Sequence, residues 1–212
     1  MNTDEIQLAR GYPLGGISRL LSTPTAKNKL SDFLVGRYNE RYFEPIDLLL
    51  CQRRNYGFAI MSLCCLLAET MECYRKGLPT TSAFEWKKRV KTINDSAPAE
   101  YKITTPIQNS KAAFIDFFQN NSTWFPNVDG EQFYYNFRNG LLHQAQTQDG
   151  WRIVTYGETY DVNHKTLNRT KFAKALRQCF DGFVETLRKL EWEDPIWVMT
   201  RRKIWWLIEL SR

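Results

Sequence analysis

Hydrophobic residues recur at helical spacing along most of this chain. The clearest case lies between Phe58 and Lys76. Its apolar side chains return every three or four positions, at Ile60, Leu63, Leu67 and Met71. Gly77 follows where a C-terminal cap belongs, so the pattern predicts a helix that ends near Lys76. Small and apolar residues fill much of its other side, which indicates that this helix is largely buried.

Shorter stretches with the same spacing predict further helices. Pro45 and Pro195 suit a first helical turn, and Asn168 suits an N-terminal cap. One predicted helix begins near Pro45. The others span Phe84 to Ile93, Lys111 to Asn120, Glu131 to Gln144, Asn168 to about Leu190, and about 194–210. At about residues 150–162, β-branched and aromatic residues take over, with Gly157 among them. This stretch predicts a β-hairpin inserted between helices.

Glycine and proline are frequent near the N-terminus. They occupy Gly11, Pro13, Gly15, Gly16 and Pro24. This pattern predicts that residues 1–41 form a loop-rich arm packed on the rest of the chain. Residues 42–212 then form one helical domain. The expected fold class is all-α, a helical bundle with one small inserted hairpin and an extra C-terminal helix.

The composition is that of a folded domain. Of the 212 residues, 43% are hydrophobic and 14% aromatic, which suffices for a full core. Lys and Arg number 29 against 23 Asp and Glu, and the net charge of +6 suits a polyanionic partner such as RNA. Charge alone does not decide this, because many domains of similar charge bind no nucleic acid.

Cysteine usage and the N-terminus indicate a reducing compartment, and we expect the cytoplasm. The five cysteines form no CxxC pair, and most fall in apolar helical stretches. The first residues are polar and do not resemble a signal peptide. The longest apolar run, Phe58 to Ala68, has about half of the roughly 20 residues that a membrane span requires, so we expect no membrane association.

Few residues remain that can carry chemistry. The chain has two histidines, His143 and His164, and no GxxxxGK[ST] or GxGxxG motif for phosphates. Its histidines and cysteines are not spaced as zinc ligands, and no serine stands in a nucleophile elbow. We therefore expect no metal site and no cofactor. His164 follows the predicted hairpin, where an exposed loop histidine is the simpler interpretation.

The remaining candidate is the segment from Arg138 to His143, which reads Arg-Asn-Gly-Leu-Leu-His. RNA is cleaved without a metal when its 2′-hydroxyl attacks the adjacent phosphorus. Imidazole suits the proton transfers because its pKa lies near neutral pH. Guanidinium stabilises the charge that builds on the phosphoryl oxygens. One arginine and one histidine therefore make a minimal metal-independent ribonuclease set.

Spacing alone favours a simpler interpretation, a surface arginine and a histidine at the edge of the core. Five positions on a regular α-helix separate two side chains by about 140°. Arg138 and His143 converge only if the long arginine wraps around the helix or if the helix is irregular near Gly140. If the two residues form a site, the motif therefore predicts a wrapped arginine side chain or an irregular helix near Gly140.

The surroundings of this segment resemble the HEPN domain family. The residues match its R-x(4–6)-H motif, with the polar Asn139 directly after the arginine. They stand in the phrase Tyr-x-x-Phe-Arg-Asn-Gly-Leu-Leu-His-Gln-Ala. A predicted buried helix pair precedes them and a long helix follows, so the resemblance covers about residues 42–190.

The resemblance implies a metal-independent endoribonuclease of prokaryotic defence or toxin systems, acting as a homodimer whose motifs face each other. His143 would be the general base or acid, Arg138 would hold the scissile phosphate, and Asn139 would support the site. Glu69 is an acidic residue on an otherwise apolar helix, so it either pairs with Arg138 or is an exposed carboxylate. RNA is the expected partner, together with an antitoxin or sensor protein.

Two alternatives stay open. The alternative to a ribonuclease is a non-catalytic HEPN-like helical module that binds nucleotide or a partner protein, since some members of the family lack activity. The cations Arg201, Arg202 and Lys203 beside two tryptophans are candidates for RNA binding, because bases stack on aromatic rings. Alternatively, this stretch is an amphipathic helix that docks on the bundle, which its apolar residues favour.

Overall fold

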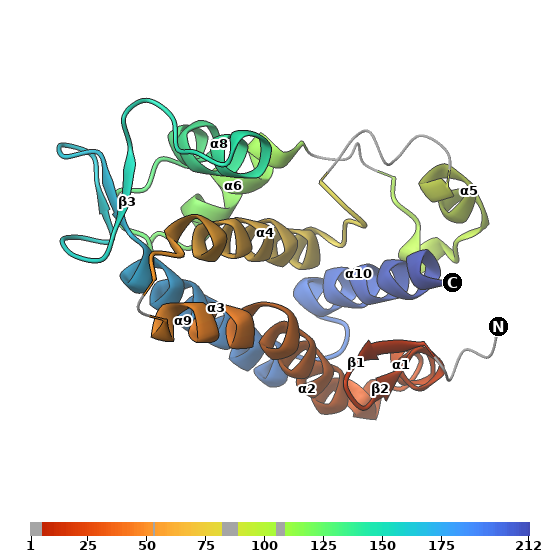
Figure 1. Cartoon of the computed structure of the whole chain (residues 1–212). Helices are drawn as coiled ribbons and strands as arrows, with labels where there is room; N and C mark the ends of the chain where they lie inside the picture. The colour runs from red at the N-terminus through yellow and green to blue at the C-terminus, as the bar shows by residue number, and fades with distance from the viewer. Residues whose placement is uncertain (1–5, 53, 82–88, 105–108) are drawn as a thin grey trace. The chain divides into compact units, whose positions relative to one another are not determined.

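The computed structural model describes residues 6–52, 54–81, 89–104 and 109–212. It is predominantly helical with small β-sheets, as Figure 1 shows, which confirms the predicted predominance of helices. The chain forms two compact units, which are described separately. The first comprises Met1–Arg41, Cys73–Asn109 and Gly182–Arg212, and the second comprises Tyr42–Glu72 and Ser110–Asp181.

The N-terminal part of the first unit is helical after a short strand pair. Its elements are β1 (Gln7–Ala9), antiparallel β2 (Tyr12–Pro13), α1 (Leu14–Leu21), a 3-10 turn (Pro24–Ala26) and α2 (Lys27–Tyr38). The prediction that residues 1–41 are loop-rich is therefore wrong. Leu14, Ile17 and Leu21 form a stripe that is at most 5% exposed. Burial of this stripe outweighs the low helix propensity of the glycines between them.

The remainder of the first unit centres on the C-terminal helix. Its elements are α5 (Arg89–Ser96), a 3-10 turn (Ala99–Tyr101) and α10 (Pro195–Ser211). Asp194 caps α10 by accepting a hydrogen bond from the Ile196 amide, so the predicted C-terminal helix is confirmed. Trp206 Nε1 donates to the Tyr101 carbonyl at 3.2 Å and anchors α10 within this unit. The predicted helix at 84–93 lies partly outside the described residues.

The second unit contains most of the predicted helices. Its elements are α3 (Glu44–Cys51), α4 (Gly57–Lys76), α6 (Ser110–Asn120), α7 (Gly130–Phe133), a π-helical turn (Tyr134–Asn139), α8 (Gly140–Gln144) and α9 (Arg169–Lys189). The residues of α4 after Glu72 and those of α9 after Asp181 belong to the first unit. A further π-helical turn, Asn39–Phe43, precedes α3. As predicted, Asn168 caps α9 by accepting from the Thr170 and Lys171 amides. Gly77 follows α4 with φ of +64°, a conformation that suits glycine.

Aromatic rings fill the core of the second unit. The buried phenylalanines that contact one another are Phe114, Phe117, Phe118, Phe125, Phe133, Phe137 and Phe172. Gly130 permits α7 to approach α6 closely, because a Cβ there would lie 2.6 Å from the Ile115 Cα. This core holds α7 and the π-helical turn in place.

A small sheet replaces the predicted hairpin. Its strands are β3 (Arg152–Val154), β4 (Tyr160–Asp161) and β5 (Thr166–Asn168), in the order β3-β5-β4. The predicted pairing of the two halves of residues 150–162 is wrong, because β5 lies between them, parallel to β3 and antiparallel to β4. Asp161 accepts a hydrogen bond from the His164 amide at 3.0 Å, and this turn returns the chain between the outer strands.

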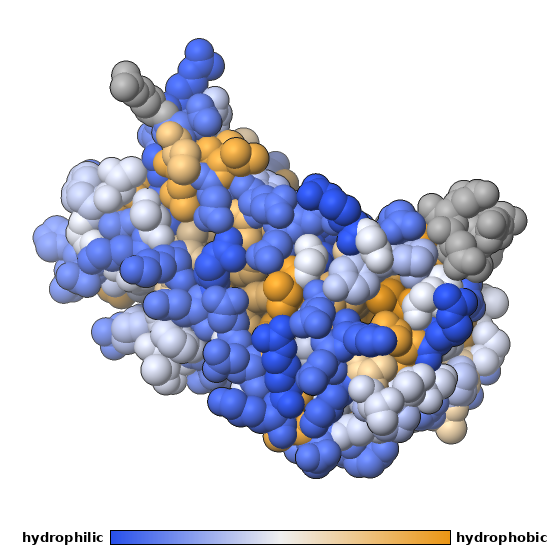
Figure 2. All heavy atoms as spheres, turned by 90° about the horizontal axis from the view of Figure 1, so that it is seen from below, coloured by the Kyte–Doolittle hydropathy of each residue, from blue (hydrophilic) through white to orange (hydrophobic). Residues whose placement is uncertain are grey.

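Helix α4 is long and apolar enough to cross a membrane by length and composition alone, among the residues that the structure describes. Its most apolar window has a mean hydropathy of 1.3 and is 67% buried within the molecule. Buried core helices of other proteins meet the same criteria. The face drawn in Figure 2 is mainly hydrophilic, with separate hydrophobic areas.

Candidate functional site

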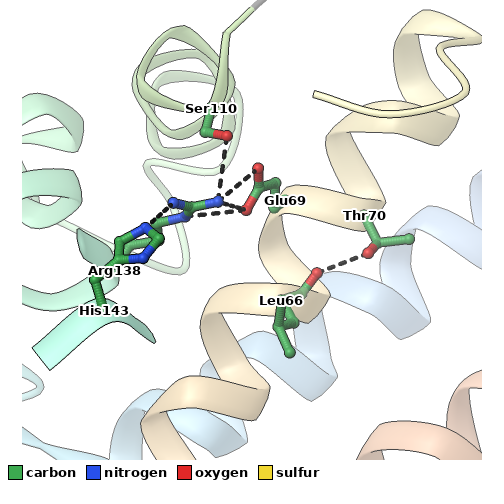
Figure 3. Close-up of polar contacts among 6 residues, drawn as sticks. All are labelled: Leu66, Glu69, Thr70, Ser110, Arg138 and His143. Carbon is green, nitrogen blue, oxygen red and sulfur yellow. Dashed lines mark hydrogen bonds and ion pairs between the residues drawn. The ribbon is translucent and has the colours of Figure 1, made fainter. Parts of the chain in front are cut away.

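Arg138 and His143 lie on consecutive pieces of one irregular helix. Arg138 belongs to the π-helical turn, and His143 belongs to α8. The π-helical turn ends one residue after Arg138 and the next four residues up to His143 are α-helical, so the length of the arginine side chain also contributes to the contact. Arg138 Nη1 lies 3.4 Å from His143 Nε2 (Figure 3). The irregularity expected near Gly140 is thus present in the turn that ends at Asn139.

The guanidinium of Arg138 also forms an ion pair with Glu69 on α4. Arg138 Nε and Nη2 lie 3.3 and 3.2 Å from Glu69 Oε2, and Nη2 lies 3.4 Å from Oε1. The side chains are 16% and 10% exposed, respectively. Charges so far removed from water require partners, which explains an acidic residue on an apolar helix. The structure therefore brings Glu69 to Arg138, the pairing that the sequence suggested.

Two further side chains surround the guanidinium. Arg138 Nη2 donates to Ser110 Oγ at 3.3 Å, at the start of α6. The Arg138 Cζ lies 5.6 Å from the centre of the Tyr134 ring, a cation–π contact. No sequence motif indicates Ser110, which is 28 positions from Arg138 and reaches it only through the packing of α6.

The contact with Arg138 determines which ring nitrogen of His143 accepts a hydrogen bond. Arginine has five N–H donors and no acceptor, so Nε2 of His143 is the acceptor in this contact. The Glu69, Ser110 and His143 contacts engage Nε, Nη2 and one Nη1 hydrogen of Arg138. No side chain among the described residues engages the second Nη1 hydrogen, which is left for a ligand. His143 itself is exposed, so an incoming hydroxyl can reach its ring.

The chain folds back directly after His143. Ala145 has φ of 54°, in the left-handed region, and reverses the direction of the backbone. The Gln146 amide then donates to the Gly140 carbonyl at 3.4 Å, and the Gln148 amide donates to the Asn136 carbonyl at 2.9 Å. A Cβ at Gly140 would lie 2.4 Å from the Gln146 carbonyl oxygen. Only glycine lets this return segment lie against the helix that carries the site.

No protein-family model matches this chain. No curated protein and no solved structure matches it either. The resemblance to HEPN domains therefore depends on Arg138, Asn139 and His143 and on the helices around them.

Asn139 ends the π-helical turn and is half-buried. Within the part of the chain that the structure describes, its side chain makes no hydrogen bond to Arg138 or His143. The structure thus brings Arg138, His143 and Glu69 together, while Asn139 is near them only through the backbone.

The C-terminal cations do not form an open basic surface. Arg201 and Lys203 are 5% and 9% exposed. Arg201 donates to the Trp192 carbonyl and stacks on the ring of that residue, with its Cζ 4.1 Å from the ring centre. Lys203 Nζ donates to the Pro79 carbonyl at 2.6 Å, and Arg202 Nε donates to a backbone carbonyl at 3.3 Å. The prediction that these three residues bind RNA is not supported, because their charges serve contacts within the first unit.

His164 lies where the sequence placed it, in an exposed turn. Its Nδ1 is 2.7 Å from Asp161 Oδ2. Hydrogen bonds from the His164 backbone and ring lower the pKa of Asp161 below its ordinary value. Among the described residues, no group of three or more His, Cys, Asp or Glu side chains is arranged to hold a metal ion.

Proposed function

We propose that this chain is a metal-independent endoribonuclease of the HEPN type, acting in prokaryotic defence or as a toxin. The observation that carries the proposal is the contact between Arg138 and His143 at 3.4 Å, with the arginine fixed by Glu69 and the histidine exposed. A guanidinium that is held in place costs little reorganisation when phosphate charge develops beside it. An accessible imidazole next to it is suited to take a proton from a hydroxyl.

In the proposed reaction, the RNA chain is cleaved at one phosphodiester bond by transfer of the phosphorus from the 5′-oxygen to the neighbouring 2′-oxygen. When the substrate displaces Arg138 from His143 Nε2, this nitrogen takes the proton of the 2′-hydroxyl, and the 2′-oxygen forms a bond to the adjacent phosphorus. The bond from phosphorus to the 5′-oxygen breaks, and this oxygen receives a proton from an imidazolium. The products are a 2′,3′-cyclic phosphate and a 5′-hydroxyl. Arg138 stabilises the charge on the phosphoryl oxygens through its remaining Nη1 hydrogen.

The proposed active form is a homodimer. One chain offers one histidine beside one arginine, whereas the reaction needs both a base and an acid. A second copy whose His143 faces the same phosphate would supply the other group. In a toxin system, an antitoxin or sensor protein would control this dimer.

A non-catalytic module remains the second candidate, and one observation favours it. A buried arginine that is paired with a glutamate and a serine hydroxyl is also a common structural arrangement. In that case Arg138 would fasten α4 and α6 to the π-helical turn, and His143 would have no proton to transfer.

RNA cleavage in the presence of a chelator separates these candidates. Single-stranded RNA with a 5′ label is incubated with the whole protein and excess EDTA, and product ends are analysed for cyclic phosphate. His143→Ala should reduce cleavage by about 100-fold or more. His164→Ala is the matched control, because that histidine is exposed in a turn, and its activity should equal that of the wild type. Equal cleavage by His143→Ala, or complete loss of wild-type activity with EDTA, would contradict the proposal.

A further inference from the structure

A cavity of about 400 Å³ opens beside the π-helical turn, within the second unit. Its lining residues are Gln132, Tyr135, Asn136, Asp149, Trp151 and Lys165, with Val162. Sites for small organic ligands commonly have volumes of about 300–1,000 Å³, so this cavity has room for one planar ring system. None of these side chains takes part in the Arg138–His143 contact.

Asn136 is a largely buried residue whose side-chain amide stays accessible in the wall of the cavity. It is 9% exposed, and its side chain makes no hydrogen bond to any residue that the structure describes. Its backbone is fixed, because the Asn136 carbonyl accepts from the Gln148 amide at 2.9 Å. Since the Asn136 amide is accessible in the cavity wall, its donor and its acceptor are open to a ligand that offers both.

Aromatic rings provide flat walls. Tyr135 is 45% exposed, although it is large and carries an aromatic ring. Trp151 is 4% exposed and stacks on Tyr160, with the ring centres 4.5 Å apart. Trp151 also meets Phe137 edge to face at 5.2 Å, which fixes it to the core. Trp151 is thus a fixed part of the wall, while the exposed Tyr135 ring offers a face on which a nucleobase can stack.

The charges around the cavity are balanced, which disfavours a phosphate as its occupant. Lys165 Nζ lies 3.0 Å from Asp149 Oδ2, and Lys111 Nζ lies 3.0 Å from Glu131 Oε1 beside Tyr135. The hydrogen bond to Glu131 is the main reason that the pKa of Lys111 is raised. With each cation next to a carboxylate, a planar and uncharged group fits the cavity better than an anion does.

The backbone of the cavity wall is strained at two positions. Asp149 and Lys165 have φ of 53° and 49°, in the left-handed region that side chains other than glycine rarely adopt. Lys165 Nζ donates to the Asp149 carbonyl at 2.9 Å and so ties the two positions together. Strained positions that are held by such contacts concentrate at ligand sites.

The cavity lies close to Arg138. Tyr134 connects them, since its ring centre is 5.3 Å from that of Tyr135 and 5.6 Å from the Arg138 Cζ. The Tyr135 ring is therefore within about 11 Å of the guanidinium. A nucleotide next to a phosphate bound at Arg138 can reach this distance.

We propose that this cavity binds the base of a nucleotide adjoining the scissile bond, with Tyr135 stacking on the base and Asn136 reading its edge. This inference rests on the proposed ribonuclease function. An asparagine amide offers a donor beside an acceptor and matches adenine through N6 and N7, so adenine is the expected base. The site would give the enzyme a preference for RNA with adenine beside the cleaved bond.

Binding is measured with the full chain carrying His143→Ala, which removes cleavage from the measurement. The probes are labelled 2′-O-methyl pentanucleotides that differ only in the central base, and the readout is fluorescence anisotropy. In this background Tyr135→Ala should weaken binding of every probe by about 5- to 100-fold, as loss of one stacked base does. Tyr135→Phe should retain the affinity. Tyr156→Ala is the matched control, because Tyr156 is 67% exposed and does not line the cavity, and it should change nothing.

Asn136→Leu should abolish the preference for the adenine probe while the remaining affinity persists. Asn136→Asp keeps the side-chain shape and an acceptor but removes the donor, so it provides a second test if Asn136→Leu does not fold. Equal affinity for all four bases in the His143→Ala protein, or unchanged binding by Tyr135→Ala, overturns the cavity proposal even if the wild type cleaves RNA. Base-selective binding without cleavage by the wild type supports the cavity and removes the proposed function.

Discussion

Arg138 and Glu69 form an ion pair between two helical segments that are 69 positions apart in sequence, with N–O distances of 3.2 to 3.4 Å. The same guanidinium contacts His143, so the carboxylate on α4 sets where the arginine meets the imidazole. Stability and chemistry are therefore coupled at this position. A change at Glu69 affects both.

Glu69→Gln should lower both cleavage and stability. The amide keeps an acceptor but removes the charge that balances a half-buried guanidinium. We expect the free energy of unfolding to fall by about 2 kcal/mol in urea titrations. Cleavage should fall because the arginine is held less firmly.

The pairing is tested with a double-mutant cycle. The double variant Glu69→Gln/Arg138→Gln should lose less free energy of unfolding than the two single variants lose together. Each single variant leaves one unpaired charge, whereas the double variant leaves none. Strict additivity of the unfolding free energies would show that the two side chains do not stabilise each other.

Gly140→Ala should damage the site without touching its polar residues. The new Cβ would lie 2.4 Å from the Gln146 carbonyl oxygen, so the return segment after His143 must move. Overpacking of this kind costs about 1–3 kcal/mol, and cleavage should fall as well. Gly182→Ala is the matched control, because nothing lies within 4 Å of a Cβ there in α9. It should stabilise the protein by about 0.5–1 kcal/mol. Opposite signs in thermal or urea unfolding are the expected result, and equal effects would contradict it.

Long amphipathic stretches allowed most of the fold to be predicted. The stripe in α4 and the Asn168 cap of α9 are local features, and local sequence determines them. Helix α1 was missed because the glycines suggested a loop, whereas tertiary burial of Leu14 and Ile17 decides its structure. The β3–β5 pairing was missed because parallel strands are joined by a crossover connection, which has no turn motif that predicts it.

The candidate site was predictable to the extent that it lies in one short segment. The angle between Arg138 and His143 required either a wrapped arginine side chain or an irregular helix near Gly140, and a π-helical turn ends at Asn139. Ser110 and the cavity at Asn136 depend on the packing of segments distant in sequence. Periodicity and motifs carry no information on such contacts.

Thiol reactivity should distinguish one cysteine from the other four. Cys51 is exposed, while Cys64, Cys65, Cys73 and Cys179 are buried. Burial raises the pKa of Cys64 and Cys65 well above the ordinary value, so both stay protonated and unreactive at neutral and mildly alkaline pH. Titration of the native protein with a thiol reagent at pH 8 should consume one equivalent rapidly. The remaining thiols should react only in denaturant, and Cys51→Ser should remove the rapid phase. Rapid reaction of several thiols in the native state would contradict the burial of α4.

Lys203→Met tests whether the C-terminal cations stabilise the fold or bind RNA. Lys203 Nζ donates to the Pro79 carbonyl at 2.6 Å and lies 5.9 Å from the Tyr74 ring centre. Methionine keeps much of the apolar stem but loses these contacts, so the free energy of unfolding should fall by about 1–3 kcal/mol. RNA affinity of the folded protein, and its dependence on salt, should not change.

Lys29→Met is the control, because it removes the same charge from an exposed position of the first unit. It should change the unfolding free energy by at most about 0.5 kcal/mol. If Lys203 contacted a phosphate, the slope of log affinity against log salt would instead fall by about 1. That result, with unchanged stability, would restore the RNA-binding interpretation of α10.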